Sequence, residues 1–362
     1  MDMMFVEDCC QILDSMRVPI TASDREEGEY PYYGANGIQD YVADYIFDDE
    51  LVLLAEDGGN FGSKERPIAY RVSGKCWVNN HAHVLKPKDG LDVDYLCYSL
   101  MFYKVEGMVN GATRQKLTQA AMRKMQIPSR SMDEQKYIVD ELNCIIRIKE
   151  QRQQELQLLD DLIKARFVEM FGDPKINEKR WNSGIISDYY EVKGGKRIPK
   201  GMGYSARVTT HPYLRATDMK NETILDEDIH YIDDEVYEHI KRYTVKGGDI
   251  YLTNVGVNLG MAGVIPEKYD GANLTENAVK LVPKTEKIID GRFLAHYINS
   301  PGIQEYINER KMSVGVPKLA IFRIETMPLL LPPIDIQIQF VKFYHQVDKS
   351  KVVKQKVRIK NN

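Results

Sequence analysis

Hydrophobic residues recur with helical spacing over one long stretch, from Met132 to Phe171, whereas the flanking sequence is built from shorter runs. Ser131 and Glu134 stand at its start, where their side chains can accept hydrogen bonds from the first free backbone N–H groups. At its end Gly172 tolerates a left-handed turn, and Pro174 cannot continue a helix. Such a helix is about 60 Å long at 1.5 Å per residue, which exceeds the needs of a compact domain. The pattern predicts a spacer or a partner-binding surface.

The sequence before this helix is a succession of short apolar or aromatic runs broken by Gly, Asn and Asp. Such runs are typical of strands joined by tight turns, and they lie at 31–38, 45–62 and 68–72. A helix is expected at 94–104, because the apolar residues there share one face. The pattern predicts an α+β domain.

The segment after Pro174 repeats the first segment in order and in type of element. Five phrases match in sequence, which chance rarely produces. The matches are PYYGANGI (31–38) with PYLRATDM (212–219), DDELVLLAEDGGNFG (48–62) with GGDIYLTNVGVNLG (247–260), HAHVLKP (81–87) with NAVKLVP (277–283), YLCYSLMF (95–102) with FLAHYINS (293–300), and 113–135 with 316–337. The repeat predicts a tandem duplication with globular domains at 1–130 and 173–332, a central helix at 131–172 and a C-terminal helix at 333–362.

Both predicted helices carry a heptad seam, which favours pairing between them. The apolar seam positions are Ile138, Leu142, Ile145, Leu156, Leu159 and Ile163 in the first helix and Phe340, Phe343 and Val347 in the second. The first seam also runs through Lys149, Arg152, Arg166 and Met170. Because the seam is partly polar, we expect a two-stranded coil that is imperfect and shared with other partners. The alternative is that each helix packs only on its own globular domain.

Composition and charge narrow the class of protein without naming a function. The chain has 362 residues, 43% of them hydrophobic and 28% charged, which fits a soluble protein of several domains. It has no run of membrane-spanning length, no signal-peptide pattern at its start and five scattered cysteines, so we expect a cytoplasmic protein with reduced thiols. The net charge of −4 neither indicates nor excludes nucleic-acid binding.

No cluster of residues predicts a catalytic or metal site. His81 and His83 share one face of a predicted strand, but no second pair of ligands accompanies them, so a structural role is favoured. Glu56, Asp57 and Lys64 are faintly similar to the acidic pair and lysine of a nuclease. The turn-like sequence between them favours a surface loop, and a stand-alone magnesium-dependent nuclease is kept as the alternative.

Basic residues in glycine-rich loops are the better candidates for function. Glycines let backbone N–H groups approach a phosphate, and lysine or arginine neutralises its charge. The candidate DNA-binding residues are Lys64 and Arg66 in 59–67, Arg114 and Lys116 in 110–116, Lys193, Lys196, Arg197 and Lys200 in 192–201, and Lys318 in 310–318. Arg114 with Lys116 in one copy and Lys318 in the other fall at equivalent places, which favours DNA binding over a merely solvated surface.

The order of domain, helix, domain and helix resembles the specificity subunit of type I restriction-modification enzymes. The phrases that carry the resemblance are PYYGANGI, LLAEDGGNFG, NNHAHVL, QKLTQAAMRKMQIP followed by DEQKYIVDEL, and LDDLIKARFVEMFGDP. The resemblance implies two target-recognition domains, each reading half of a bipartite DNA sequence, and an antiparallel helix pair that holds them apart. The second helix has no counterpart of ARFVEMFGDP, so we expect it to be shorter.

The same resemblance implies partners and a division of labour. Two modification subunits would bind S-adenosylmethionine and methylate adenine, and a restriction subunit using ATP and magnesium would cleave DNA. The chain itself would be non-catalytic and would hold no cofactor and no metal. A third hypothesis, a protein-interaction scaffold without a DNA role, is distinguished by whether the basic loops contribute to DNA binding.

Overall fold

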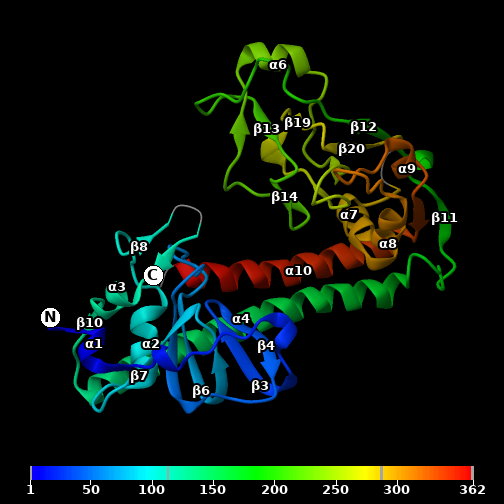
Figure 1. Ribbon diagram of the computed structural model, residues 1–362. Helices are drawn as coiled ribbons and strands as arrows, with labels where there is room; N and C mark the ends of the chain where they lie inside the picture. Colours follow the sequence, from blue (N-terminus) through cyan, green and yellow to red (C-terminus); the bar gives the residue numbers. More distant parts are fainter. Residues whose placement is uncertain (1, 112–113, 286–287, 360–362) are drawn as a thin grey trace. The chain divides into compact units, whose positions relative to one another are not determined.

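The computed structural model describes residues 2–111, 114–285 and 288–359, with side chains to Lys351. The chain forms two compact units, Met1–Arg152 and Gln153–Asn362 (Figure 1). Helix α4 (Met132–Phe171) contributes to both units, and its bounds are those predicted from the sequence. The predicted capping is also present, because the Glu134 carboxylate accepts from the Ser131 backbone N–H at 2.9 Å and the Ser131 hydroxyl accepts from the Glu134 N–H at 3.3 Å.

The first unit is built on a six-stranded sheet of order β2-β7-β5-β6-β3-β4. Its elements are β1 (Met3–Phe5), α1 (Val6–Cys9), β2 (Cys10–Ile12), β3 (Glu27–Gly34), β4 (Gly37–Val42), β5 (Phe47–Ala55), β6 (Ala69–Val78), β7 (Ala82–Pro87), α2 (Val93–Met101), β8 (Val109–Asn110), β9 (Lys116–Leu117), α3 (Gln119–Arg123) and β10 (Gln126–Pro128). Both faces of β5 are buried, because Val52 and Leu54 pack with α2 while Leu51 and Leu53 enter a second cluster. Neighbouring strands are antiparallel except β3 and β6.

The second unit has a four-stranded sheet of order β12-β20-β17-β18 and a smaller sheet of order β16-β13-β19. Its elements are β11 (Asn182–Ile185), α5 (Ile186–Tyr189), β12 (Tyr190–Gly194), β13 (Pro212–Leu214), β14 (Met219–Lys220), β15 (Thr223–Ile224), β16 (His230–Tyr231), α6 (Asp234–Ile240), β17 (Ile250–Thr253), β18 (Ala262–Val264), β19 (Asn273–Leu274), β20 (Ala278–Pro283), α7 (Gly291–Asn299), α8 (Pro301–Arg310), α9 (Ile321–Glu325), β21 (Pro328–Leu331) and α10 (Ile334–Ile359). No helix of the described residues is long and apolar enough to span a bilayer.

The two globular domains share a topology, as the tandem duplication predicts. Strands β2-β7-β5-β6 of the first correspond to β12-β20-β17-β18 of the second, with antiparallel pairing throughout both sets. In each domain the opening strand pairs with the strand just before the long helix, β1 with β10 and β11 with β21. The α+β duplication is therefore confirmed in three dimensions.

An equivalent buried glutamine fastens each long helix to its domain. Gln135 of α4 accepts a hydrogen bond from the backbone N–H of Asp92 at 2.8 Å, and Gln337 of α10 accepts one from Asp290 at 2.8 Å. Each side-chain amide also donates to two backbone carbonyl groups, and both glutamines are 0% exposed. Asp92 and Asp290 are the N-caps of α2 and α7, so the same hydrogen bond connects a helix of each domain to the long helix that follows that domain.

Helices α4 and α10 pack against each other within the second unit. The Phe340 ring of α10 lies 5.3 Å from the Phe167 ring and 5.7 Å from the Phe171 ring of α4. Lys351, further along α10, forms an ion pair with Asp160, earlier on α4. The two helices therefore run antiparallel, which confirms the predicted pairing.

The predicted heptad seam misses the two most deeply buried aromatic residues at the end of α4. Ile163 is buried as predicted, and the most deeply buried positions after it are Phe167 and Phe171, which are each 2% exposed. Met170 of the predicted seam is half-buried against the same core, and Arg166 is half-buried over the Phe343 ring. The reason is that this segment packs into a globular core of α7, α10 and β strands, for which an ordinary helical repeat with steps of four suits better than a coiled-coil seam.

Candidate nucleic-acid interface

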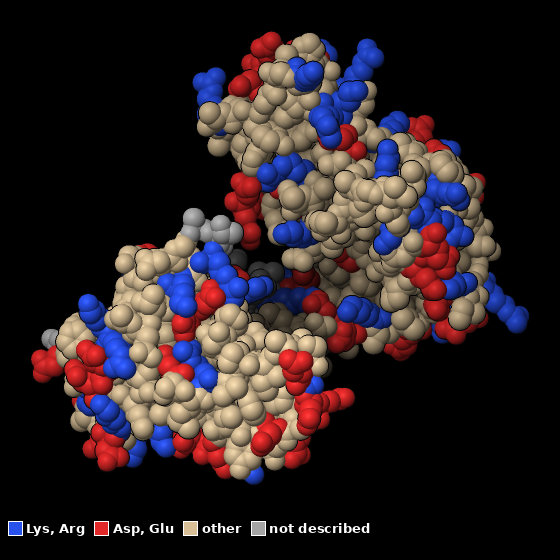
Figure 2. All heavy atoms as spheres, in the orientation of Figure 1, with Lys and Arg blue, Asp and Glu red and all other residues tan. Residues whose placement is uncertain are grey.

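All nine basic residues predicted to bind DNA have exposed side chains. They are Lys64, Arg66, Arg114, Lys116, Lys193, Lys196, Arg197, Lys200 and Lys318. Figure 2 shows that lysine and arginine are interspersed with aspartate and glutamate over the visible face of each unit. Any attraction for phosphate must therefore depend on local groups of cations rather than on a uniformly positive surface.

Lys116 and Lys318 occupy the same structural position in the two domains. The backbone of Lys116 bridges to that of Asp57, and the backbone of Lys318 bridges to that of Val255 in the same antiparallel sense. In the first domain the Leu117 backbone N–H donates to the Glu56 backbone carbonyl at 2.7 Å. In the second, the Leu319 backbone N–H donates to the Asn254 backbone carbonyl at 2.8 Å. The duplication therefore presents one lysine at the same loop of each domain.

The two lysines differ in their electrostatic surroundings. The Lys116 ammonium lies 3.1 Å from the Glu56 carboxylate. Asn254 stands in the place of Glu56 and is neutral, and its buried Oδ1 has no hydrogen-bond partner among the described residues. Since Lys318 has no ion pair within the described part of the chain, its charge is the less compensated of the two.

The basic loop that follows β12 is partly neutralised by acidic neighbours. Arg197 pairs with Glu276 at 2.6 Å, and Lys193 pairs with Glu191 at 2.5 Å. Burial alone would raise the pKa of Glu276, but the Arg197 hydrogen bond and charge, a backbone hydrogen bond and the Thr275 hydroxyl together lower it. Lys196 lies over the Tyr243 ring, 5.8 Å from its centroid. The loop thus combines fixed ion pairs with a cation held beside an aromatic face.

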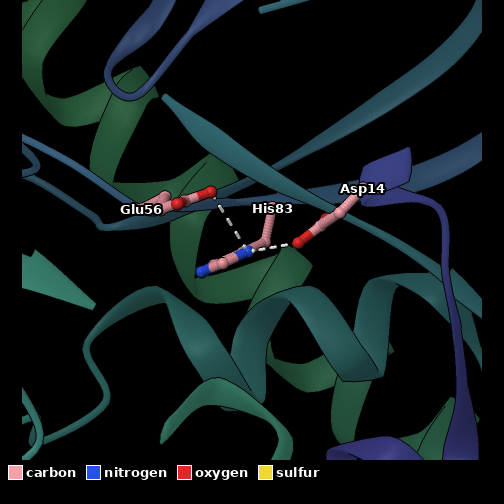
Figure 3. Close-up of side chains that lie close together, drawn as sticks. All are labelled: Asp14, Glu56 and His83. Carbon is pink, nitrogen blue, oxygen red and sulfur yellow. Dashed lines mark hydrogen bonds and ion pairs between the residues drawn. The ribbon is translucent and has the colours of Figure 1, made fainter. Parts of the chain in front are cut away.

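A buried polar network underlies the Lys116 loop, and it comes from segments far apart in the sequence (Figure 3). The His83 Nδ1 lies 2.7 Å from an Asp14 carboxylate oxygen, and its Nε2 lies 2.9 Å from the Leu117 carbonyl. A carboxylate oxygen and a backbone carbonyl oxygen therefore lie within hydrogen-bond distance of the two ring nitrogens of His83. Arg17 donates to Glu56 at 2.6 Å, so the half-buried guanidinium joins the buried Asp14, Glu56 and His83 side chains in one network.

The network keeps its two acids ionised. Burial by itself would raise the pKa of Asp14, but hydrogen bonds from His83 and Gln119 and the His83 charge together lower it. The pKa of Glu56 is lowered in the same way, because Arg17, His83 and Lys116 outweigh the effect of burial. The two carboxylates are therefore stabilised in their charged form by the donors and cations around them.

Asp14, Glu56 and His83 are close enough to hold a metal ion, with ligand atoms within 4.8 Å of one another. Both nitrogens of His83 already lie within hydrogen-bond distance of an oxygen atom. Arg17 already compensates the carboxylates at this place. The arrangement fits a structural ion network better than a metal site.

The same contacts give no support to a nuclease site at Glu56 and Asp57. Glu56 faces the buried network, whereas Asp57 pairs with Arg114 at 2.6 Å and lies 3.4 Å from His81. Lys64 is exposed and has no ion pair with either carboxylate among the described residues. The two adjacent carboxylates thus stabilise the loop from opposite sides rather than converging on one metal.

The predicted helix-seam residues divide between two cores. Ile138 packs against the core of the first unit, while Leu159, Ile163, Phe340, Phe343 and Val347 belong to the core of the second. Leu142 and Leu156 are half-buried, and Ile145 is 59% exposed. The use of the middle of α4 as a partner surface stays a prediction, as do the nine DNA-binding assignments and the bounds of the four predicted segments.

Sequence reasoning missed the participation of Asp14, Arg17 and Gln119 in the site. Gln119 donates to Asp14 at 2.8 Å across 105 positions of sequence, and Arg17 reaches Glu56 across 39 positions. No local pattern signals such pairs. His83 in a strand of apolar residues was the one available sign, since a buried histidine needs polar partners.

Comparison with known proteins gives a consistent result. The family model described as the type I restriction modification DNA specificity domain matches residues 1–158 and 178–361. A Haemophilus influenzae protein named as a type I restriction enzyme specificity subunit, S.HindORF215P, is 28% identical over 332 residues, covering 87% of this chain and 83% of the relative.

Solved structures agree at the level of fold. The S subunit of a type I restriction-modification system from M. genitalium matches with a TM-score of 0.56 at 13% identity, covering 98% of this chain and 91% of that one. A chain from a structure of type I restriction-modification complex assembly matches with a TM-score of 0.59 at 11% identity, covering 99% and 93%.

Proposed function

This chain belongs to the type I restriction-modification DNA specificity family, and we propose that each of its globular domains reads one half of a bipartite DNA target. It is a DNA-recognition and scaffold subunit rather than an enzyme. The observation that carries the proposal for individual residues is the placement of Lys116 and Lys318 at equivalent loops of the duplicated domains. Two equivalent readers on one helical framework would fix the spacing between half-sites.

Within each domain, the basic loops would position the DNA and other side chains would read it. Lysine and arginine contacts to phosphate set register and orientation but carry little sequence information. Lys64, Arg66 and Arg114 of the first domain, with Lys193, Lys196, Arg197 and Lys200 of the second, are the proposed phosphate contacts that accompany the equivalent lysine pair. Base recognition would come from groove contacts made by neighbouring loops.

The helices α4 and α10 would carry the catalytic partners. Exposed apolar residues in the middle of α4, such as Ile145, offer surface to two modification subunits. Those subunits would bind S-adenosylmethionine, and restriction subunits using ATP and magnesium would join them in the cytoplasm. The chain would bring sequence specificity to chemistry performed by others.

The proposal is tested by sequencing the methylated genome of cells that express this chain with its modification partner. The expected result is one asymmetric split motif, methylated at adenine in both half-sites. A chain with only the first domain intact should lose the second half-site from that motif. Methylation without a motif, or no methylation with a partner known to be active, would contradict the proposal.

Lys318→Gln is expected to weaken DNA binding more than the matched change Lys116→Gln. Each phosphate contact contributes about 0.9 to the slope of log affinity against log salt. Lys318 should contribute nearly all of that amount, whereas Glu56 beside Lys116 reduces the contribution of the latter. Fluorescence anisotropy of the assembled complex on target DNA, over a salt series, measures both slopes. Equal slopes for the two variants would show that the Glu56 carboxylate does not reduce the contribution of Lys116 to DNA binding.

A further inference from the structure

A pocket of about 400 Å³ in the second unit is lined by basic residues that the sequence does not place together. Its lining consists of Lys193, Gly194, Arg242, Tyr243, Thr244, Leu274 and Lys280. No acidic residue lines it. The lining therefore carries three cationic side chains, one aromatic ring and two hydroxyl groups.

Strand pairing brings two of these cations face to face. Lys193 of β12 stands directly opposite Lys280 of β20 in antiparallel register. Like charges at such positions repel each other. The ion pair of Lys193 with Glu191, which is not a lining residue, offsets part of that repulsion. The Lys280 side chain is only 17% exposed, and its nearest carboxylate, Asp249, is 3.4 Å away and also accepts a backbone hydrogen bond from Lys246. Lys280 is thus a poorly hydrated cation with a weak internal partner.

Arg242 and Tyr243 complete the site from the segment after α6. Arg242 is exposed and has no ion pair among the described residues. Tyr243 lies beneath the Lys196 ammonium, 5.8 Å from ring centroid to nitrogen. Three cations around the cavity and a fourth over its tyrosine match the charge and hydrogen-bonding needs of a phosphate group.

We propose that this pocket binds a backbone phosphate of the DNA strand held by the second domain. A phosphate there would relieve the repulsion between Lys193 and Lys280 and accept hydrogen bonds from Arg242, whose planar guanidinium suits phosphate oxygens. The inference rests on the proposed DNA-binding function, and it assigns to that function Arg242, Tyr243 and Lys280, which lie outside the loops singled out by sequence.

The test compares Arg242→Gln with Arg242→Lys and with Lys179→Gln, a change at an exposed lysine outside the pocket. Each full-length variant is assembled with the modification partner, and its affinity for target and unrelated DNA is measured over a fourfold range of salt. Loss of one phosphate contact should lower the salt slope by about 0.9, so the wild type should lose about 3- to 4-fold more affinity over that range than Arg242→Gln. Arg242→Lys and Lys179→Gln should keep the wild-type slope.

A second arm distinguishes a DNA phosphate from a free nucleotide, which shares its chemistry. The same preparations are titrated with AMP and with inorganic pyrophosphate by calorimetry. Nucleotide binding that Arg242→Gln abolishes, together with an unchanged DNA slope, would overturn the assignment to DNA, and so would an unchanged slope with no binding of either probe. Failure of the wild-type complex to bind DNA at all would instead count against the proposed function.

Discussion

Replacing Phe340 with alanine is expected to lower the free energy of unfolding of the second unit by about 3–5 kcal/mol. The Phe340 ring is 0% exposed and contacts the rings of Phe167, Phe171 and His296. Truncation would leave a cavity between α10, α4 and α7 that these rigid aromatic groups cannot fill. Because Phe340 anchors α10, the change should also loosen the antiparallel helix pair.

Urea denaturation of the full chain, followed by far-ultraviolet circular dichroism, measures this loss. The matched control is Phe322→Ala, since Phe322 is 57% exposed in the same unit and its removal should cost little. Limited proteolysis supplies a second measurement, because cleavage within α10 should become faster in the Phe340 variant. Similar losses for both variants would show that the aromatic cluster does not hold α10 in place.

Asp14→Ala is expected to destabilise the first unit by about 3–5 kcal/mol, because it removes one partner from a buried ion network. The Asp14 carboxylate accepts from His83, Gln119 and the backbone N–H of Val84. All three donors would lose their acceptor in a site with little access to water. Asp89→Ala, at an exposed aspartate of the same unit, is the control and should be nearly neutral.

The same variant should change how stability depends on pH. The pKa of Asp14 and that of Glu56 are lowered in the folded protein, from unfolded values of about 3.9 and 4.3. The unfolded chain therefore binds more protons in mild acid, and the stabilisation is present above these values and is lost as pH falls through the folded pKa values. Urea titrations between pH 3 and pH 6 should show a shallower acid loss for Asp14→Ala than for the wild type. Parallel curves would exclude Asp14 as a source of acid sensitivity.

Local sequence signals predicted the long helix and the duplication, and long-range contacts escaped prediction. Ser131, Glu134 and Gly172 mark the ends of α4 through contacts within a few residues of sequence, so its bounds could be read directly. The deep burial of Phe167 and Phe171 could not, because it depends on which surface the helix packs against. The same limit applies to the pocket, since the Lys193 and Lys280 pairing exists only once strand register is known.

The candidate site divides in the same manner. The equivalence of Lys116 and Lys318 follows from the repeat and is matched by the backbone bridges. The effect of having Glu56 in one domain and Asn254 in the other could not be predicted, because it depends on how deeply each side chain is buried beside its lysine. How far the charge of each lysine is neutralised by its neighbours can therefore be seen only in the three-dimensional structure.

The strand pairs β1 with β10 and β11 with β21 place the entrance and the exit of each globular domain side by side. The chain thus enters and leaves each domain through one pair of adjacent strands, and the rest of the domain lies between these two strands in the sequence. Insertions between the two paired strands, such as the segment that contains α6 in the second domain, can lengthen the domain without displacing the helix that follows it. Loops inside a domain can therefore change in length while the paired strands keep the same attachment to the helix that follows.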